Sequence, residues 1–417
     1  MLPKVSVSRH TSTHAENLQL YRPLVGDEMM DEIFDLGQKL KGLKVCQVNA
    51  TASGGGVAEL LARQVPIMEH LGIRTDWRIM HADDEFFNIT KNFHNALQGM
   101  QFNLNKKIEK EYLEHNQISA KMLENTYDVY FIHDPQPAAI RHFIKKSQAK
   151  WIWRCHIDSS DPNQEVWQFL RPYIERYDAA IFTMDKFSPK DLKMDHISFI
   201  PPAIDPMATK NMDLPLEICQ KAIADSGIDP QRPLLVQVSR FDPWKDPLGV
   251  IQVYKKVKEK FPDVQLALVG SMALDDPEGW EILENMNAES EKDPDMYVFT
   301  NLAGVGNMEV NAFQRVADVI IQKSLKEGFG LVITEAFWKE KAVVAGEAGG
   351  IPMQFPKGYE KYLINNIDDC AKQVSYLLQH PGKAAEFGRA GKEWIRQNFL
   401  LPRLIRDELR LIYKLTH

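Results

Sequence analysis

The segment Ser324–Glu335 reads SLKEGFGLVITE and has the residue types of an anion-binding turn. Gly328 and Gly330 allow the backbone to turn tightly and to approach a ligand closely. A helix is predicted from Leu331 onward, because residues at positions i, i+3, i+4 and i+7 suit one helical face. The free backbone N–H groups and the dipole at such a helix start attract an anion.

Glu327 and Glu335 place carboxylates on this turn, eight residues apart. This separation lets one carboxylate reach the polyol end of a ligand and the other its far end. On spacing alone, a turn residue and a solvated helix residue explain the two acids equally well, since charged side chains are usually exposed.

A second cluster follows a predicted strand that begins near Pro233, and it carries Arg240 and Lys245. Two cations across a Pro-containing turn can neutralise a diphosphate, the guanidinium through paired bonds and the ammonium as a point charge. Negative charge that grows on a leaving phosphate would then be stabilised in the transition state. The ordinary alternative is two unrelated surface cations.

Polar groups also end two predicted strands in the first half of the chain. His133 is followed by Asp134 and Gln136, and His156 is followed by Asp158. In open α/β sheets, ligands bind beyond the carboxyl ends of the strands. Without further context, a histidine at such an end is as often a satisfied structural residue.

Three glycines, Gly54, Gly55 and Gly56, separate a predicted strand from a predicted helix that runs to about Leu71. Their bare backbone N–H groups can meet a phosphate or a sugar. Taken alone, a flexible tight turn explains the run better. The run departs from the GxGxxG pattern and therefore does not support a Rossmann dehydrogenase.

The elements that must position these residues alternate between strand and helix along the chain. Strand-like runs recur at 43–50, 74–80, 128–133, 151–156, 179–184, 197–200, 233–239, 264–271, 296–302, 319–321 and 343–346. This alternation predicts βαβ units and parallel sheets with helices on both faces. Consecutive prolines at 201–202 mark the crossing into a second domain. We expect an extension at 1–42, domains at 43–206 and 207–395, and a helix in 396–417 that crosses back to the first domain.

Composition bounds the class of protein. The chain has 417 residues, 44% hydrophobic, enough for two domains of roughly 200 residues each. A net charge of −7 argues against general nucleic-acid binding. No apolar run of about 18 residues and no signal-peptide pattern are visible, so we expect a cytoplasmic protein without a membrane partner. The four cysteines lack CxxC spacing and suggest neither zinc nor a disulfide framework.

The residues from Glu327 to Ala336 strongly resemble the donor-binding signature of glycosyltransferase family 4 (glycosyltransferase group 1). The members of this family are retaining enzymes that use nucleotide sugars. The resemblance spans nearly the whole chain from Leu43. It implies an α/β protein of the GT-B fold, with two Rossmann-like, doubly wound parallel-sheet domains facing each other across a cleft. The stretches Asn49–Glu59, His133–Pro137 and Trp153–Asp161 look most like the trehalose-forming members. Those members join glucose from a nucleoside-diphosphate glucose (ADP-, UDP- or GDP-glucose) to free glucose, reversibly.

The resemblance also implies roles for individual residues. Catalytic roles are implied for Glu327, Arg240, Lys245 and His156. Donor binding is implied for Gly54, Gly55, Gly56, Gly270, Gly328, Phe329, Gly330, Leu331 and Glu335. Acceptor binding is implied for His133, Asp134, Gln136 and Asp158. Arg240 and Lys245 together form a cationic clamp for the diphosphate, so no obligatory cofactor is expected. A divalent cation such as Mg²⁺ is left open as an activator. Asp293-Pro-Asp295 has the form of a metal-binding motif but is interpreted as solvated surface.

Other functions stay open at this point. A trehalose phosphorylase would use glucose 1-phosphate, and a sucrose-forming synthase or a nucleotide-sugar 2-epimerase would share the two-domain plan. A sugar-binding protein without activity would need neither the cationic clamp nor the donor-side acids. The sequence is compatible with both a monomer and a homodimer.

Overall fold

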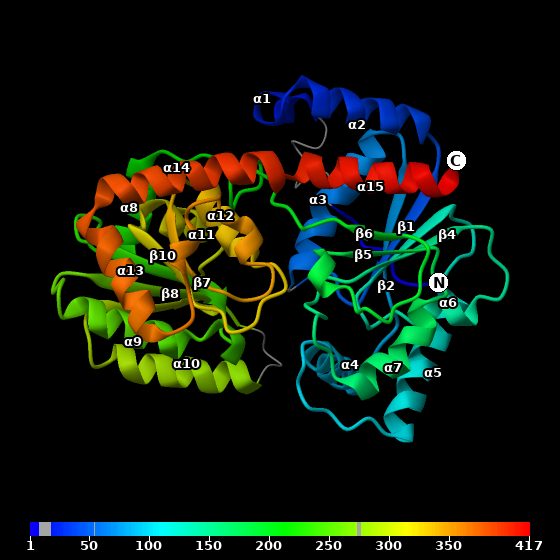
Figure 1. Ribbon diagram of the computed structural model, residues 1–417, viewed down its shortest axis with the longest axis horizontal. Helices are drawn as coiled ribbons and strands as arrows, with labels where there is room; N and C mark the ends of the chain where they lie inside the picture. The colour runs from blue at the N-terminus through cyan, green and yellow to red at the C-terminus, as the bar shows by residue number, and fades with distance from the viewer. Residues whose placement is uncertain (8–17, 54, 273–276) are drawn as a thin grey trace. The chain divides into compact units, whose positions relative to one another are not determined.

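The computed structural model describes residues 1–7, 18–53, 55–272 and 277–417 (Figure 1). The chain divides into two compact units. Unit 1 comprises Met1–Ala203 together with Leu401–His417, and unit 2 comprises Ile204–Leu400. The sequence-based boundaries, at 206/207 and 395/396, differ from these by a few residues.

Unit 1 is built on a parallel sheet, six-stranded over the described residues, with the order β2-β1-β3-β4-β5-β6. The strands are β1 (Lys44–Asn49), β2 (Arg74–Ile79), β3 (Val129–His133), β4 (Lys150–Arg154), β5 (Ala179–Phe182) and β6 (Ile197–Phe199). β3 and β5 are buried at every position, which explains their unbroken apolar sequence. The strand order reverses between β1 and β3. The loops that leave the carboxyl ends of these two strands therefore run to opposite faces of the sheet, which opens a place for a ligand between them.

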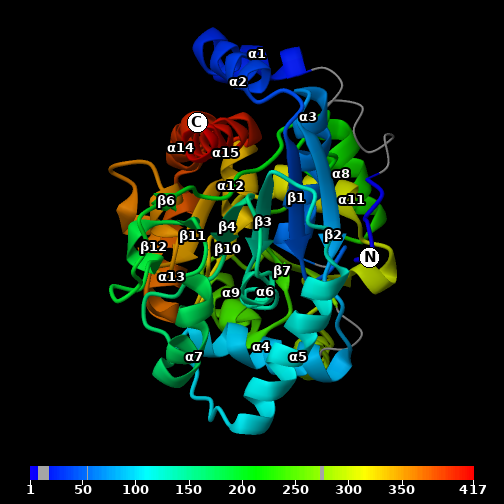
Figure 2. The ribbon, with the colours of Figure 1, turned by 90° about the vertical axis from the view of Figure 1, so that its right-hand side faces the viewer.

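The helices of unit 1 bury their apolar faces on this sheet and on one another. They are α1 (Arg22–Val25), α2 (Asp27–Lys39), α3 (Gly56–His70), α4 (Asp84–Leu97), α5 (Lys106–Met122), α6 (Ile140–Phe143), α7 (Gln164–Ile174) and α15 (Leu401–Thr416). The core on the α4, α5 and α7 side is aromatic, with Tyr130 stacked on Trp151 at 4.0 Å between ring centroids. The final helix, α15, packs against α2 and α3, as the red and dark blue ribbons show in Figures 1 and 2. The two ends of the chain thus belong to the same unit.

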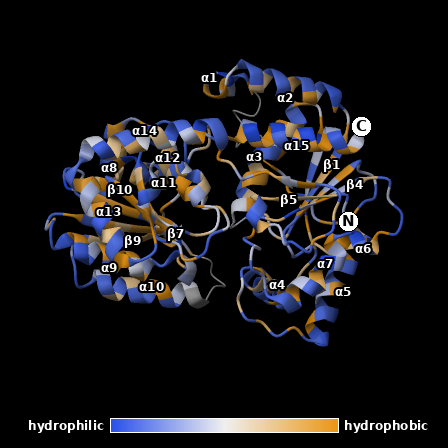
Figure 3. Cartoon of the chain, in the orientation of Figure 1, coloured by the Kyte–Doolittle hydropathy of each residue, from blue (hydrophilic) through white to orange (hydrophobic). Residues whose placement is uncertain are grey.

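Unit 2 repeats the plan with the order β12-β11-β10-β7-β8-β9. Its strands are β7 (Leu234–Arg240), β8 (Gln265–Ser271), β9 (Met296–Thr300), β10 (Val319–Gln322), β11 (Ala342–Gly346) and β12 (Leu363–Ile364). Its helices are α8 (Leu216–Asp225), α9 (Pro247–Lys258), α10 (Pro277–Ser290), α11 (Asn307–Val316), α12 (Leu331–Trp338), α13 (Ile367–Gln379) and α14 (Pro381–Asn398). α9 packs with α13, α8 with α11, and α12 with α14. Figure 3 shows hydrophobic strands within more hydrophilic helices. The strand order reverses between β7 and β10.

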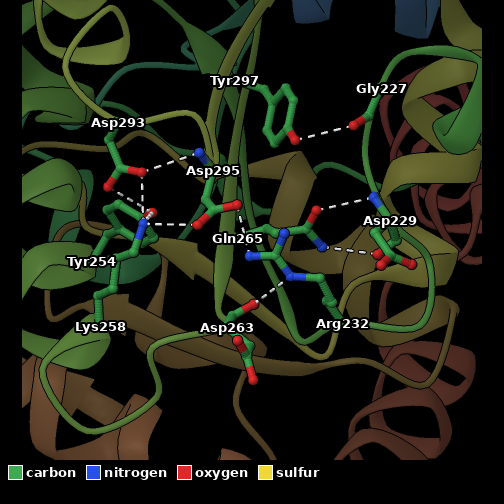
Figure 4. A network of polar contacts seen from close by, with 10 residues as sticks. All are labelled: Gly227, Asp229, Arg232, Tyr254, Lys258, Asp263, Gln265, Asp293, Asp295 and Tyr297. Carbon is green, nitrogen blue, oxygen red and sulfur yellow. Dashed lines mark hydrogen bonds and ion pairs between the residues drawn. The ribbon is translucent and has the colours of Figure 1, made fainter.

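The residues Asp293 and Asp295 lie at the amino end of β9, the edge opposite the strand ends where a ligand would bind. Lys258 Nζ lies 2.6 Å from an oxygen of Asp293 and 2.9 Å from one of Asp295. Arg232 adds an ion pair to Asp295 at 2.6 Å. Figure 4 shows the Lys258 ammonium between the two carboxylates and the Arg232 guanidinium on the other side of Asp295. The interpretation as solvated surface is therefore wrong: the two acids are partly buried members of an ion network that ties α9 to β9.

Candidate active site

The carboxyl ends of β7 and β10 bring Lys245 and Glu327 into direct contact. Lys245 Nζ lies 2.6 Å from Glu327 Oε2, although 82 positions separate them in the sequence. The Ser324 hydroxyl donates to the same oxygen at 3.3 Å. β7 and β10 are neighbours at the strand-order reversal, the location expected for a ligand site in an open sheet.

The backbone at Lys245 is held by three side chains around it. Asp242 caps the short 3₁₀ turn Pro243–Lys245 by accepting from the Lys245 N–H at 3.2 Å. Gln237 donates from Nε2 to the Lys245 carbonyl at 2.8 Å. Asp246, with φ 48°, caps α9 by accepting from the Gly249 N–H at 3.0 Å. The lysine is thus presented by a rigid turn.

Arg240, the last residue of β7, is the exposed partner in this cluster. Its side chain is 60% exposed, whereas that of Lys245 is 17% exposed. The ion pair that the structure records for its guanidinium within the described residues is to Asp242, at 3.2 Å. An exposed guanidinium near a half-buried ammonium gives two donors for a ligand with two phosphate groups.

The turn before α12 depends on a glycine conformation at Gly330 and is closely packed against the loop at Gly350. Gly330 has a φ of 87°, a conformation that strains other residues, and it precedes α12 without a side-chain cap. A Cβ at Gly350 would lie 2.6 Å from the Gly328 carbonyl oxygen. Phe329 is buried against Phe399, with ring centroids 5.4 Å apart. The turn therefore leaves the first N–H groups of α12, from Leu331 onward, without a side-chain acceptor from their own cap.

Glu335 is 1% exposed, so its interpretation as a solvated helix residue is wrong. Its carboxylate forms an ion pair with Lys210 at 2.9 Å and faces Gln314 at 3.5 Å. The Lys339 ammonium donates to Gln314 at 2.7 Å, and burial lowers the pKa of Lys339 to about 7. Sequence reasoning missed Lys210, because no pattern in its segment connects it to a helix far along the chain.

Gly270, in β8, has a structural reason to be glycine. A Cβ there would lie 2.3 Å from the ring of Phe241, the residue that follows Arg240. The absence of a side chain at Gly270 thus leaves room for the Phe241 ring, which follows Arg240 at the end of β7. A donor contact for Gly270 stays a prediction.

In unit 1, the buried side chains of Gln47 and His133 and the half-buried side chain of His156 form a hydrogen-bonded row across β1, β3 and the end of β4. His133 Nε2 lies 2.8 Å from Gln47 Oε1, and His133 Nδ1 lies 3.0 Å from His156 Nε2. Burial, with the positive charge of Arg154, lowers the pKa of His133 to about 3. The same causes and His133 lower the pKa of His156. Both rings are neutral at physiological pH. The two histidines, each predicted at the end of a strand, are brought together in the structure.

Asp134 positions His156 through the backbone. It adopts a φ of 65°, and its Oδ1 accepts from the His156 N–H at 2.8 Å. Its carbonyl oxygen accepts from the Trp153 indole at 3.0 Å. Burial raises the pKa of Asp134 to about 7. A half-buried aspartate in the left-handed conformation that holds the loop after the next strand is the kind of backbone strain found at functional sites.

The remaining predicted residues of unit 1 are less closely joined to this row. The Gln136 carbonyl accepts from Asn116 at 3.0 Å, which anchors its backbone. Asp158 accepts from the Ser160 N–H and hydroxyl at 3.1 and 2.6 Å, and so closes a local turn.

The glycine run lies only partly within the described residues, because Gly54 is outside them. Gly55 is extended at the start of α3, and Gly56 is its first residue. A Cβ at Gly55 would meet no atom within 4 Å. The packing of unit 1 does not require glycine at this position.

Behind the histidines, Arg154 forms a buried ion pair with Glu408 of α15, which also accepts from Gln64. Arg154 and Glu408 are both 1% exposed. The helix predicted near Pro402 is confirmed as α15, but its glutamate was not expected to reach the sheet. A buried acid in an otherwise apolar helix face is the signal that could have indicated it.

Among the described residues, no cluster of three or more His, Cys, Asp or Glu side chains is arranged to hold a metal ion. The described helices also include none with the length and apolar content needed to cross a bilayer.

Comparisons with known proteins show which family the chain belongs to. Residues 47–189 match the family described as trehalose synthase, N-terminal domain, and residues 220–394 match glycosyl transferases group 1. A trehalose synthase of Rubrobacter xylanophilus is 49% identical over 400 residues, covering 95% of this chain and 96% of its own. A trehalose phosphorylase of Pleurotus pulmonarius is 27% identical, covering 85% of this chain and 55% of its own.

Solved structures share the fold. A UDP-forming α,α-trehalose-phosphate synthase from Burkholderia xenovorans superposes with a TM-score of 0.70 at 15% identity. The match covers 89% of this chain and 98% of that one. The expected GT-B fold is thereby confirmed. With both domain families matched and a relative of nearly equal length at 49% identity, the chain belongs to the group 1 glycosyl transferases, with the N-terminal domain of the trehalose synthases.

Proposed function

We propose that the protein is a retaining glucosyltransferase that forms trehalose from a nucleoside-diphosphate glucose and free glucose. The observation that carries this proposal is the contact of Lys245 with Glu327 beside the exposed Arg240. It is supported by the trehalose synthase relatives, which are similar over nearly the whole chain.

The donor would use three features of unit 2. Its diphosphate would bind the charged side chains of Arg240 and Lys245. It would also accept hydrogen bonds from the first N–H groups of α12, which carry partial positive charge. Its glucosyl hydroxyls would hydrogen-bond to the Glu327 carboxylate, which accepts from Lys245 and Ser324 in this structure. A cation and an acid in direct contact suit a sugar phosphate, because one end of the ligand is anionic and the other carries hydroxyl donors.

The transfer would proceed on one face of the sugar. The bond from the anomeric carbon to the phosphate oxygen breaks, and the acceptor hydroxyl oxygen forms a new bond on the same face. The acceptor proton passes to the departing phosphate, whose negative charge Arg240 and Lys245 stabilise. Glu327 would orient the sugar rather than attack it. Positioning and charge stabilisation then supply the rate, without a covalent glycosyl-enzyme and without a resident metal ion.

The reaction itself is tested by product analysis. Purified protein is incubated with ¹³C-labelled glucose and ADP-, UDP- or GDP-glucose, and the disaccharide is identified by NMR. Labelled α,α-trehalose that forms with at least one nucleotide sugar supports the proposal, and EDTA should leave the rate unchanged. Trehalose that forms from glucose 1-phosphate alone would instead identify a phosphorylase.

The roles of the residues are tested by variants of unit 2. Arg240→Ala and Lys245→Ala should each lower kcat by roughly 100-fold or more, the effect of losing one charge-stabilising group. Lys260→Ala, which removes an exposed lysine of the same unit, should leave kcat unchanged. Glu327→Ala should be nearly inactive, and added azide should not restore it. Azide rescue that yields glucosyl azide would make Glu327 a nucleophile and refute front-face transfer.

A further inference from the structure

A separate pocket of about 880 Å³ lies at the edge of the unit 1 sheet opposite its histidines. Its wall includes Leu43, Asp128 and Lys150, which stand at the amino ends of β1, β3 and β4. His133 lies at the other end of β3. The mechanism proposed above uses no residue of this pocket, although its volume suits a small-molecule ligand.

The pocket gathers positive charge. Arg141, Lys145, Lys146 and Lys150 line it, and Asp128 is the single carboxylate among the described residues of its wall. Within the described part of the chain, none of these four cations forms an ion pair at 4.0 Å or less. Asp128 is engaged locally, accepting from the Lys44 N–H at 2.8 Å. Like charges held close together repel one another, and an anion bound among them would relieve that repulsion.

Arg141 is already oriented. Its guanidinium carbon lies 5.4 Å from the centre of the Trp151 ring, and NH1 donates to the Ile144 carbonyl at 2.7 Å. Its Nε is buried and has no hydrogen-bond partner among the described residues. Because these contacts already hold the guanidinium in place, an anion that binds its accessible side need not order the side chain first. The planar fork of arginine suits phosphate oxygens.

The loop that carries the lysines is fixed at both ends. Asn125 donates to the Lys146 carbonyl at 2.8 Å, which ties the loop before β3 to the loop before β4. The Ser147 hydroxyl accepts from the Ala149 N–H at 3.2 Å and from the Trp151 indole at 3.1 Å. Because these bonds order the loop before any ligand arrives, binding loses less conformational entropy.

We propose that this pocket is a binding site for a small compound with two or more phosphate charges, distinct from the donor site of unit 2. The positive charges are confined to one pocket of a chain with a net charge of −7, which favours a compact polyanion over an extended nucleic acid. The phosphate oxygens of the ligand would accept hydrogen bonds from the forked guanidinium of Arg141, and the positive charges of the lysines would attract them. The pocket lies at the amino ends of β3 and β4, whereas His133 lies at the carboxyl end of β3.

The test must separate this site from the donor site, which would also bind diphosphates. Tripolyphosphate is titrated calorimetrically into the Arg240→Ala/Lys245→Ala protein, whose donor clamp is removed. Binding should persist there, with an affinity that falls as salt rises. The triple variant Lys145→Ala/Lys146→Ala/Lys150→Ala, made in the same background, should bind at least 10-fold more weakly.

Two matched variants complete the experiment. Lys186→Ala/Lys190→Ala/Lys193→Ala removes three exposed lysines elsewhere in unit 1 and should bind like the parent. Arg141→Lys keeps the charge but loses the fork, and should also bind more weakly. Circular dichroism checks that each variant is folded. Loss of binding in the clamp variant, or equal weakening in both lysine triples, would overturn the proposal. Because the readout is binding, it stands or falls separately from the proposed transferase activity.

The class of ligand follows from a second set of titrations. Nucleoside triphosphates and glucose 6-phosphate are compared with tripolyphosphate in the clamp variant. A preference of 10-fold or more for one of them identifies the class of ligand. If none of the three competes with tripolyphosphate, the assignment to phosphorylated metabolites is refuted.

Discussion

The buried pair of Arg154 and Glu408 should dominate the stability of unit 1. In a Glu408→Ala variant, Arg154 would stay 1% exposed with its charge uncompensated, and its remaining acceptor would be the Ile200 carbonyl at 3.3 Å. Removing one partner of a buried ion pair costs about 3–5 kcal/mol. We expect the upper half of this range, because the one remaining hydrogen bond of Arg154 is long and Gln64 also loses its acceptor.

Two comparisons separate the charge effect from simple loss of packing. The double variant Arg154→Met/Glu408→Leu leaves no buried charge and should recover most of the loss, since apolar replacements of buried pairs are often neutral. On the same helix, Arg410 pairs with Glu32 at the surface, with exposures of 52% and 31%. Glu32→Gln should cost only about 0.2–1 kcal/mol.

The measurement is urea unfolding combined with hydrogen exchange of β3 and β4, because a chain of two units need not unfold in one step. Glu408→Ala should speed exchange in the strands of unit 1 and leave unit 2 unaffected. A loss no greater than that of Glu32→Gln, or a double variant as unstable as either single one, would refute the reasoning.

Three further predictions concern unit 2. Glu335→Gln should weaken binding of a free nucleoside diphosphate by about 1.5–3 kcal/mol, measured by calorimetry, and unchanged affinity would remove Glu335 from the donor site. Gly346→Ala would place a Cβ 2.2 Å from the Ser324 carbonyl oxygen. It should shift the loop before Glu327 and lower kcat together with the melting temperature, whereas normal kinetics would show that the loop adapts. Burial lowers the pKa of Lys339 from 10.5 to about 7, so the unfolded chain binds an extra proton between these pH values and stability rises with pH there. Lys339→Met should flatten that slope by up to about 1.4 kcal/mol per pH unit, as compared by urea unfolding at pH 7 and pH 9.

The sequence predicts local elements better than long-range polar contacts. The strand before Ser324, the glycine turn and the helix from Leu331 follow from residues that are adjacent in the chain, and all three are confirmed. The clamp residues Arg240 and Lys245 were placed at a strand end by the same local reasoning, and the structure agrees.

Contacts between distant segments could not be predicted in this way. Lys210 and Glu335 pair because the loop before α8 meets α12 in unit 2, and Arg154 meets Glu408 because α15 returns to unit 1. Nothing in hydrophobic periodicity specifies which polar side chains will meet once helices pack. Asp293 shows the same limit: its charged neighbours in the sequence suggest exposure, whereas its partner Lys258 comes from α9.

The row from Gln47 through His133 to His156 has a consequence for proton positions. Each neutral imidazole carries one N–H, so every hydrogen bond in the row must point in the same direction. When the Gln47 oxygen accepts from His133 Nε2, His133 Nδ1 must accept from His156 Nε2, and His156 Nδ1 keeps a lone pair. A half-turn of the Gln47 amide reverses both bonds and changes both tautomers. The amide of Gln47, whose Nε2 has no partner within the described structure, thus determines whether His156 offers a neighbouring hydroxyl group an acceptor or a donor.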